Sequence, residues 1–190
     1  MKIFITGSSG FIGKNLINLL LKKDHSIFAT TRKKQKIKNK KLKWLYGDFN
    51  ENWQKELKQS DLLIHLATSG VNKNNIKNDI YEVNIFKSLN LLQNAVKAGC
   101  KKWLIISSSS EYGKNLKNKN KEFDVSSNRI PDSDYGISKA IFCDQCINFA
   151  KKHKCQVRVM RIFPAFGKGE NKNRLYPSLI QAIKKKKNFI

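Results

Sequence analysis

Residues 2–13 read KIFITGSSGFIG, a short apolar run followed by a turn that carries three evenly spaced glycines. The apolar run ends at Gly7, which is typical of a buried strand. Apolar side chains then recur at the spacing of one helical face, so a helix should follow and end near Asp24. Glycines between a strand and a helix let a pyrophosphate approach the helix N-terminus. The segment predicts a dinucleotide-binding turn, and a glycine turn without a ligand is the alternative.

The alternation of apolar strand and amphipathic helix continues along the chain. Further strands are predicted at 26–31, 42–46, 61–66, 102–107 and 156–162, and further helices at about 51–59, 78–98 and 134–152. Continuous apolar strands separated by helices are typical of a parallel sheet covered on both faces. We therefore predict an α/β protein with a doubly wound parallel sheet, a Rossmann fold, over residues 1–166. Residues 167–190, with a helical segment at 174–187, should begin a second, smaller domain.

Composition narrows the class of protein. The chain has 190 residues, 40% of them hydrophobic, and no apolar run reaches the ~20 residues of a membrane span. Glycines interrupt the apolar N-terminus and no cleavage site follows, so a secretory signal is not expected. Lys and Arg number 38 against 14 Asp and Glu, but lysines in predicted loops supply nearly all the charge, whereas base and phosphate recognition favour arginine. We expect a cytoplasmic protein without a nucleic-acid or membrane partner.

Four cysteines complete the composition, at positions 100, 143, 146 and 155. They lack the paired spacing of a zinc ribbon, and without a secretory signal they should remain reduced. Cys143 and Cys146 lie near the apolar face of the predicted helix 134–152. We expect them to be small buried side chains rather than metal ligands.

A second pattern with chemical meaning is the pair Tyr135 and Lys139. Four residues apart in a predicted helix, they project from one helical face, so the ammonium would lower the phenol pKa from its usual ~10. A tyrosine tuned in this way is a general acid or base. Residues 107–110, four serines at the end of a predicted strand, could hold a substrate oxygen beside the phenol. Taken alone, a tyrosine and a lysine at this spacing often occur by chance, and a run of serines often forms an ordinary polar turn.

Ligands of doubly wound sheets bind beyond the carboxyl ends of the strands. Gly7, Asp48, the 67–70 turn, the serine run and Phe163 should therefore gather at one edge. The strand 26–31 is followed by Arg32 and Lys33, where an NAD-preferring domain would present an acid to the ribose. A 2′-phosphate suits these two cations better, so we favour NADP over NAD, with solvated side chains as the alternative.

Taken in order, the segments resemble the extended short-chain dehydrogenase/reductase family, namely its NAD(P)-dependent nucleotide-sugar epimerases, dehydratases and ketoreductases. The matching segments are TGSSGFIG at 6–13, GDF at 47–49, HLAT at 65–68, Asn84, SSSSEYG at 107–113, YGISK at 135–139 and RIFPAFGKGE at 161–170. The resemblance implies catalytic Ser108, Tyr135 and Lys139, a structural role for Asn84, and no metal. The cofactor contacts that it implies, together with Arg32 from its charge, are Gly7, Ser9, Gly10, Phe11, Ile12, Gly13, Arg32, Asp48, Phe49, Leu66, Ala67, Thr68, Tyr135 and Lys139.

The resemblance also implies an NAD(P)-dependent oxidoreductase or epimerase that acts on a nucleotide-diphosphate sugar, and a homodimer through the helices 78–98 and 134–152. Dehydratases of the family are similar to one another in having Thr-Asp-Glu or Thr-Ser-Glu where this chain has serines at 108–110, so the acid that they use to eliminate water is missing. Glu111 comes one residue later, which on an extended strand turns it to the opposite face. We therefore favour a 4-epimerase or a 4-ketosugar reductase over a dehydratase.

Members of the family are longer than this chain, because a substrate domain follows the cofactor domain. Residues 167–190 are too few to build it. The alternative function is therefore a dinucleotide-binding remnant, inactive or regulatory. The apolar side chains of the last predicted helix, Leu175, Leu179, Ile180 and Ile183, should be exposed or covered by another chain.

Overall fold

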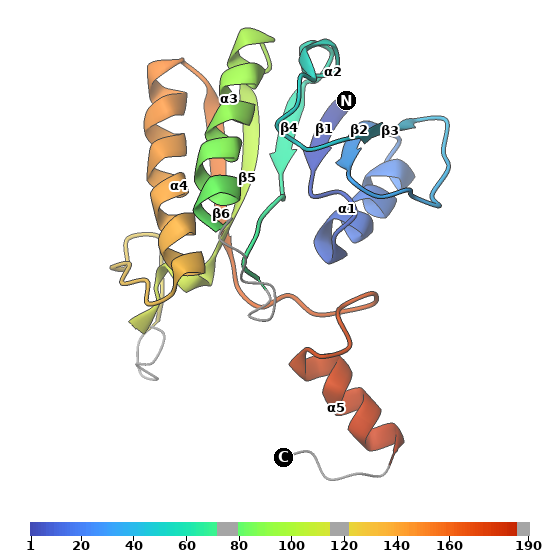
Figure 1. Ribbon diagram of the computed structural model, residues 1–190, viewed down its shortest axis with the longest axis vertical. Helices are drawn as coiled ribbons and strands as arrows, with labels where there is room; N and C mark the ends of the chain where they lie inside the picture. Colours follow the sequence, from blue (N-terminus) through green and yellow to red (C-terminus); the bar gives the residue numbers. More distant parts are fainter. Residues whose placement is uncertain (72–79, 115–121, 186–190) are drawn as a thin grey trace.

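The computed structural model describes residues 1–71, 80–114 and 122–185, and its centre is a six-stranded parallel sheet (Figure 1). The strands are β1 (Lys2–Thr6), β2 (Ser26–Thr31), β3 (Leu42–Tyr46), β4 (Leu62–His65), β5 (Lys102–Ser108) and β6 (Gln156–Ile162). Their order across the sheet is β3-β2-β1-β4-β5-β6. This is the order of the doubly wound Rossmann fold, so the predicted fold class is confirmed.

Helices cover both faces of the sheet, as the apolar stripes predict. The helices are α1 (Phe11–Lys22), α2 (Gln54–Lys58), α3 (Ser88–Lys97), α4 (Asp134–Lys152) and α5 (Leu175–Lys184). On one face Ile17 of α1 is fully buried against Ile3 and Ile5 of β1. On the other face Leu91 of α3 and Phe142 of α4 belong to a larger core. Burial of these stripes, at ~25 cal/mol per Å² of apolar area, is what holds the helices to the sheet.

The order in which successive strands are added to the sheet reverses between β1 and β4, and this determines where a ligand can bind. β1 pairs in parallel with β4 so that Thr6 lies beside His65. The segments that follow these two strands therefore leave the sheet side by side. The connections from these strands run to opposite sides, α1 to one and α3 to the other (Figure 1). The crevice at such a switch point is the usual ligand site of an open parallel sheet.

The predicted helix 78–98 differs from the structure in one respect. Its described part begins at Ile80, continues through a π-helix, Glu82–Lys87, and only then becomes α3. The wider turn lets the Ser88 hydroxyl donate to the Val83 carbonyl five residues earlier at 2.9 Å. Residues 78 and 79 lie outside the described residues. A π-turn of this kind is frequent at functional sites, and hydrophobic periodicity alone does not reveal it.

The last helix, α5, lies beyond the carboxyl edge of the sheet, apart from the rest of the molecule (Figure 1). Within the described part of the chain none of its residues is fully buried. Leu175, Ile180 and Ile183 are exposed, as expected, whereas Leu179 is half-buried. The division of the chain at residue 167 stays a prediction.

Three observations bear on the remaining expectations. Across residues 1–71, 80–114 and 122–185, no helix combines the length and the apolarity needed to cross a bilayer. The same ranges hold no group of three or more His, Cys, Asp or Glu placed to bind a metal ion. The four cysteines are free thiols; Cys143 and Cys146 are buried as predicted, and Cys100 is buried as well.

A buried histidine joins the strands at the switch point. His65 is 1% exposed, and its Nδ1 lies 2.7 Å from Thr6 Oγ1 while its Nε2 lies 2.9 Å from Ser88 Oγ. Burial lowers the pKa of His65 to about 3, and the charge of Lys139 acts in the same direction. The ring is therefore neutral in the folded protein at physiological pH, and the two hydroxyls satisfy both of its nitrogens.

We predict that His65 makes the fold sensitive to acid. The unfolded chain takes up the proton near pH 6.5 and the folded chain only near pH 3, so the stability of the fold falls as pH drops through this window. The loss approaches about 5 kcal/mol. Urea unfolding at pH 7, 5 and 4 should show a much shallower loss for His65→Asn than for the unmodified chain. Parallel pH profiles would contradict this assignment.

Candidate active site

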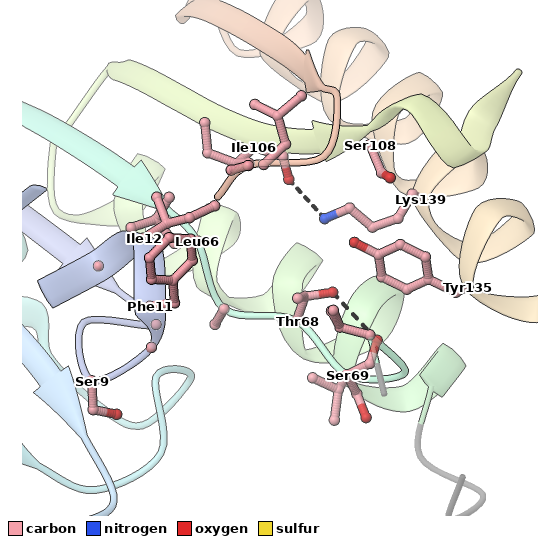
Figure 2. Close-up of a pocket in the computed structure, with 18 of the residues that line it drawn as sticks. Ser9, Phe11, Ile12, Leu66, Thr68, Ser69, Ile106, Ser108, Tyr135 and Lys139 are labelled. Carbon is pink, nitrogen blue, oxygen red and sulfur yellow. Dashed lines mark hydrogen bonds between the residues drawn. The ribbon is translucent and has the colours of Figure 1, made fainter. Parts of the chain in front are cut away.

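A cavity of about 1120 Å³ runs along the carboxyl edge of the sheet. The segments that follow all six strands contribute to its wall, and Figure 2 shows a part of it. The structure brings every cofactor and catalytic residue expected from the sequence to this one wall: Gly7, Ser9, Gly10, Phe11, Ile12, Gly13, Arg32, Asp48, Phe49, Leu66, Ala67, Thr68, Ser108, Tyr135 and Lys139. Its volume exceeds the roughly 300–1000 Å³ of a usual small-molecule site, so it has room for two ligands.

The glycine turn is built by close contact between backbones. Gly7 has φ +65°, and a Cβ on it would lie 2.7 Å from the Ala67 nitrogen. A Cβ on Gly13 would lie 2.4 Å from the Gly7 carbonyl oxygen. Among the described residues no side chain caps the start of α1, and its first turn contains no acid. The free N–H groups and the helix dipole therefore face the cavity as an anion site.

The reacting end of the cavity is formed by hydroxyl side chains from three elements. Tyr135 comes from the first turn of α4, Ser108 from the end of β5, and Thr68 from the turn after β4. Ser108 is 9% exposed, and Figure 2 shows the Tyr135 hydroxyl directed toward the Lys139 side chain. Three oxygen atoms and one ammonium group thus meet where a reacting atom of a ligand could lie.

The electrostatics of Tyr135 differ from the expectation that Lys139 acidifies it. Burial raises the pKa of Tyr135, against side-chain hydrogen bonding with Ser108 and Thr68 and the charge of Arg174, which lower it. Lys139 is 3% exposed and donates its Nζ proton to the Ile106 carbonyl at 2.7 Å. Burial lowers the pKa of Lys139 to about 8, against the charge of Glu111. Contrary to the expectation from spacing, the pKa of Tyr135 is therefore raised rather than lowered, because burial has the largest effect on the phenol.

Asn84 fixes the turn that carries Thr68. Its Oδ1 accepts from the Ser69 N–H at 2.8 Å and from the Thr68 hydroxyl at 3.0 Å. Its Nδ2 donates to the Ser69 carbonyl at 3.1 Å and to the Ser138 hydroxyl at 3.0 Å. One buried amide thus ties the turn after β4 to α4, in keeping with the structural role that the resemblance implies for Asn84.

The opposite end of the cavity, beyond β2 and β3, is lined by charged side chains. Asp48 forms an ion pair with Lys87 at 3.0 Å, and its carboxylate accepts a hydrogen bond from the Phe49 N–H at 2.7 Å. Arg32 lines the cavity with an exposed side chain, whereas Lys33 is not part of the lining. Of the two cations expected at a 2′-phosphate, only Arg32 is therefore brought to the site. The contribution of Lys87 was not foreseen, since it lies in a segment read only as helix.

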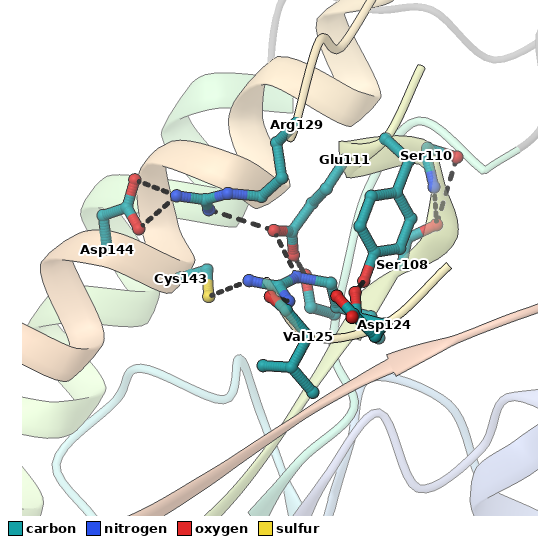
Figure 3. A network of polar contacts seen from close by, with 11 residues as sticks. Ser108, Ser110, Glu111, Asp124, Val125, Arg129, Cys143 and Asp144 are labelled. Carbon is teal, nitrogen blue, oxygen red and sulfur yellow. Dashed lines mark hydrogen bonds and ion pairs between the residues drawn. The ribbon is translucent and has the colours of Figure 1, made fainter. Parts of the chain in front are cut away.

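Glu111 is part of a network of polar contacts at the end of β5 (Figure 3). It lies at the end of the 3-10 helix Ser109–Glu111 rather than on an extended strand, and it is fully buried. Its Oε2 accepts from Arg161 at 2.8 Å and from Arg129 at 3.1 Å, and its Oε1 accepts from the Ser107 hydroxyl. Arg129 also binds Asp144 of α4. The network anchors the end of β5 beside Ser108, on the side away from the cavity.

Sequence reasoning missed one wall of the cavity. The segment that leaves β6 was read only as the path toward a second domain, yet several of its residues line the cavity: Pro164, Ala165, Gly169, Glu170, Asn171 and Arg174. This stretch has no periodicity, so no pattern indicates which of its side chains turn inward. Its position after the last parallel strand was the one available signal.

We predict that Glu111 is essential for the stability of the fold, whereas Asp144, the exposed partner of Arg129, is not. Glu111→Gln removes the buried carboxylate that two partly exposed guanidinium groups share, and it should cost about 2–3 kcal/mol of unfolding free energy. Asp144→Asn removes a half-exposed partner of Arg129 and should cost less than about 1 kcal/mol. Urea unfolding of the two variants measures the difference. Equal, small losses would show that the network carries little energy.

Comparison with known proteins agrees with this geometry. The sequence model of the NAD dependent epimerase/dehydratase family matches residues 3–190. A UDP-glucose 4-epimerase from Vibrio cholerae is 30% identical over 96% of this chain and 57% of its own length. A GDP-6-deoxy-D-talose 4-dehydrogenase from Aggregatibacter actinomycetemcomitans is 32% identical over 100% of this chain and 62% of its own. The crystal structure of a UDP-glucuronic acid 4-epimerase from Bacillus cereus with NAD superposes with TM-score 0.84 at 25% identity, over 98% of this chain and 64% of that one.

The chain spans about 60% of the length of these relatives. The match nevertheless runs through the glycine turn, the serine strand, the Tyr135 helix and α5, in the order in which they build the cavity. The chain therefore belongs to the NAD dependent epimerase/dehydratase family.

Proposed function

We propose that this chain binds NAD(P) and carries out the proton transfer of a 4-epimerase or 4-ketosugar reductase that acts on a nucleotide-diphosphate sugar. The observation that carries the proposal is that Tyr135, Ser108 and Thr68 share one cavity with the glycine turn. An anion site and a hydroxyl cluster along one continuous wall suit a dinucleotide held beside a second, hydroxyl-bearing ligand. The names of its relatives, among them a 4-epimerase and a 4-dehydrogenase, support the sugar class.

The residues present fit the cofactor. Methyl groups at positions 7 and 13 would collide with neighbouring backbone, so glycine at both positions lets the turn pack tightly. The free N–H groups at the start of α1 would then hold the pyrophosphate. Asp48 and Phe49 would hold the adenine end, and Tyr135 with Lys139 the nicotinamide end. When bound, the nicotinamide would supply hydride exchange with the sugar carbon.

Tyr135 would move the proton. Because its pKa is raised, the phenol is protonated at neutral pH and is ready to donate from Oη to a carbonyl oxygen. Side-chain hydrogen bonding with Ser108 and Thr68 and the charge of Arg174 favour the tyrosinate that remains. Ser108 would hold the reacting oxygen, and Lys139, positively charged below its pKa of about 8, would add to the stabilisation of the tyrosinate. The reverse transfer serves the oxidation of a sugar hydroxyl.

Dehydration is less well supported. The family resemblance locates the acid that eliminates water within the serine run, and of residues 107–112 only the four serines line the cavity. Glu111, the one acid in that stretch, is held by Arg129 and Arg161. Because Glu111 is outside the cavity lining, its carboxylate does not reach a ligand held beside Tyr135.

The assignment of Tyr135 is tested by Tyr135→Phe, which removes Oη and leaves the ring in place. Turnover of the best substrate in a panel of UDP-, GDP-, CDP- and dTDP-sugars should fall about 10²–10⁴-fold, while the dissociation constant of NADH changes little. Tyr46→Phe, on an exposed side chain outside the cavity lining, is the matched control. Unchanged turnover in Tyr135→Phe contradicts the assignment. A parent chain that binds NADH but turns over no sugar would favour the remnant.

The preference for NADP is proposed on Arg32 alone. Arg32→Gln should weaken NADPH binding about tenfold and leave NADH binding nearly unchanged, because only the 2′-phosphate meets the guanidinium. Lys33→Gln removes a neighbouring positive charge outside the cavity lining and serves as the control. Fluorescence titration of the chain's tryptophans measures both constants. Equal affinity of the parent chain for NADH and NADPH would overturn the preference.

A further inference from the structure

Glu170 lies on the segment that joins β6 to α5, which packs against the start of α1. Asn15 Nδ2 donates to the Lys168 carbonyl at 3.2 Å, and a Cβ on Gly167 would lie 3.9 Å from the Phe11 ring. These contacts hold the segment over the cavity, so that Glu170 forms part of the cavity wall. Neither the family resemblance nor the mechanism above gives this carboxylate a role.

The side chain of Glu170 is buried and only half satisfied. It is 5% exposed, and its Oε1 accepts from Arg174 Nε at 3.1 Å. Its Oε2 is the one buried side-chain nitrogen or oxygen that has no hydrogen-bond partner in the described part of the chain. Leaving a buried charged acceptor unpaired is costly, so such an atom at a cavity wall indicates a partner supplied by the ligand.

The position of the pair identifies the part of the ligand concerned. The charge of Arg174 acts to lower the pKa of Tyr135, against the larger effect of burial. The ion pair of Glu170 and Arg174 therefore lies within electrostatic reach of the phenol. Glu170, Arg174, Ser108 and Tyr135 all line the same cavity. The group that meets Oε2 is therefore held at the reacting end rather than at the adenine end.

We propose that Glu170 Oε2 accepts a hydrogen bond from a hydroxyl of the ligand held beside Tyr135, and that Glu170 thereby selects a neutral sugar over a uronic acid. Arg174 is the positioning residue that fixes the other carboxylate oxygen. The proposal rests on the proposed function for the identity of the ligand. A sugar hydroxyl donates to a carboxylate, whereas the carboxylate of a uronic acid would bring a second negative acceptor to the same place.

The test compares two variants of Glu170 in the full 190-residue chain. Glu170→Met keeps the length of the side chain without an acceptor, and Glu170→Gln keeps an uncharged acceptor. Dissociation constants are measured by calorimetry for NADH, and for UDP-glucose and UDP-glucuronic acid in the presence of NADH. Glu82→Met removes an exposed carboxylate from the same cavity wall and controls for loss of charge alone. Urea unfolding verifies that every variant is folded.

We expect UDP-glucose to bind Glu170→Met about 10–100-fold more weakly and Glu170→Gln only about threefold more weakly. The affinity for UDP-glucuronic acid should fall less, so that the ratio of the UDP-glucose affinity to the UDP-glucuronic acid affinity decreases. Glu82→Met should leave that ratio unchanged. If only the affinity for NADH falls, the hydroxyl belongs to the cofactor. That result supports the role of Oε2 as an acceptor for a ligand and overturns the proposed sugar selectivity.

Sugar and NADH affinities equal to those of the parent chain in both Glu170 variants would overturn the inference and show that solvent satisfies Oε2. A parent chain that binds NADH but no sugar nucleotide of the UDP-, GDP-, CDP- and dTDP-panel contradicts the proposed function instead. The NADH titrations of the Glu170 variants then decide the inference on their own.

Discussion

The close approach of the glycine turn to the end of β4 is the contact on which the site depends. Thr6 Oγ1 accepts from the Leu66 and Ala67 N–H groups, each at 3.2 Å, at the point where a side chain on Gly7 would collide with the same backbone. This contact places the start of α1 and the turn after β4 on one wall. A larger residue at position 7 would separate the anion site from the hydroxyl cluster, and no single ligand could then span both.

Buried polar groups hold the remaining walls in place. His65 joins β1, β4 and the start of α3 through two hydroxyls, Asn84 joins the turn after β4 to α4, and Glu111 joins β5 to β6. All three side chains lie behind the cavity and are almost fully buried. Satisfied buried networks cost little and specify one arrangement, which is what a site assembled from six different segments requires.

The sequence was sufficient to predict the sheet and most of the site, because a parallel sheet with helical crossovers brings the carboxyl ends of its strands to one edge whatever the side chains are. Properties that depend on tertiary partners were beyond it. The π-turn at Glu82–Lys87 accompanies the hydrogen bonds of Asn84 and Ser88. The raised pKa of Tyr135 reflects its burial, and the inward position of Glu170 depends on a segment without periodicity.

The central claim is that the glycine turn and Tyr135 serve one bound dinucleotide. A crystal structure of the chain with NADH tests it most directly. The account predicts the pyrophosphate against the N–H groups at the start of α1 and the nicotinamide ring beside Tyr135 Oη, with the adenine near Asp48. A dinucleotide bound elsewhere, or one whose nicotinamide lies at the Asp48 end, would contradict the account.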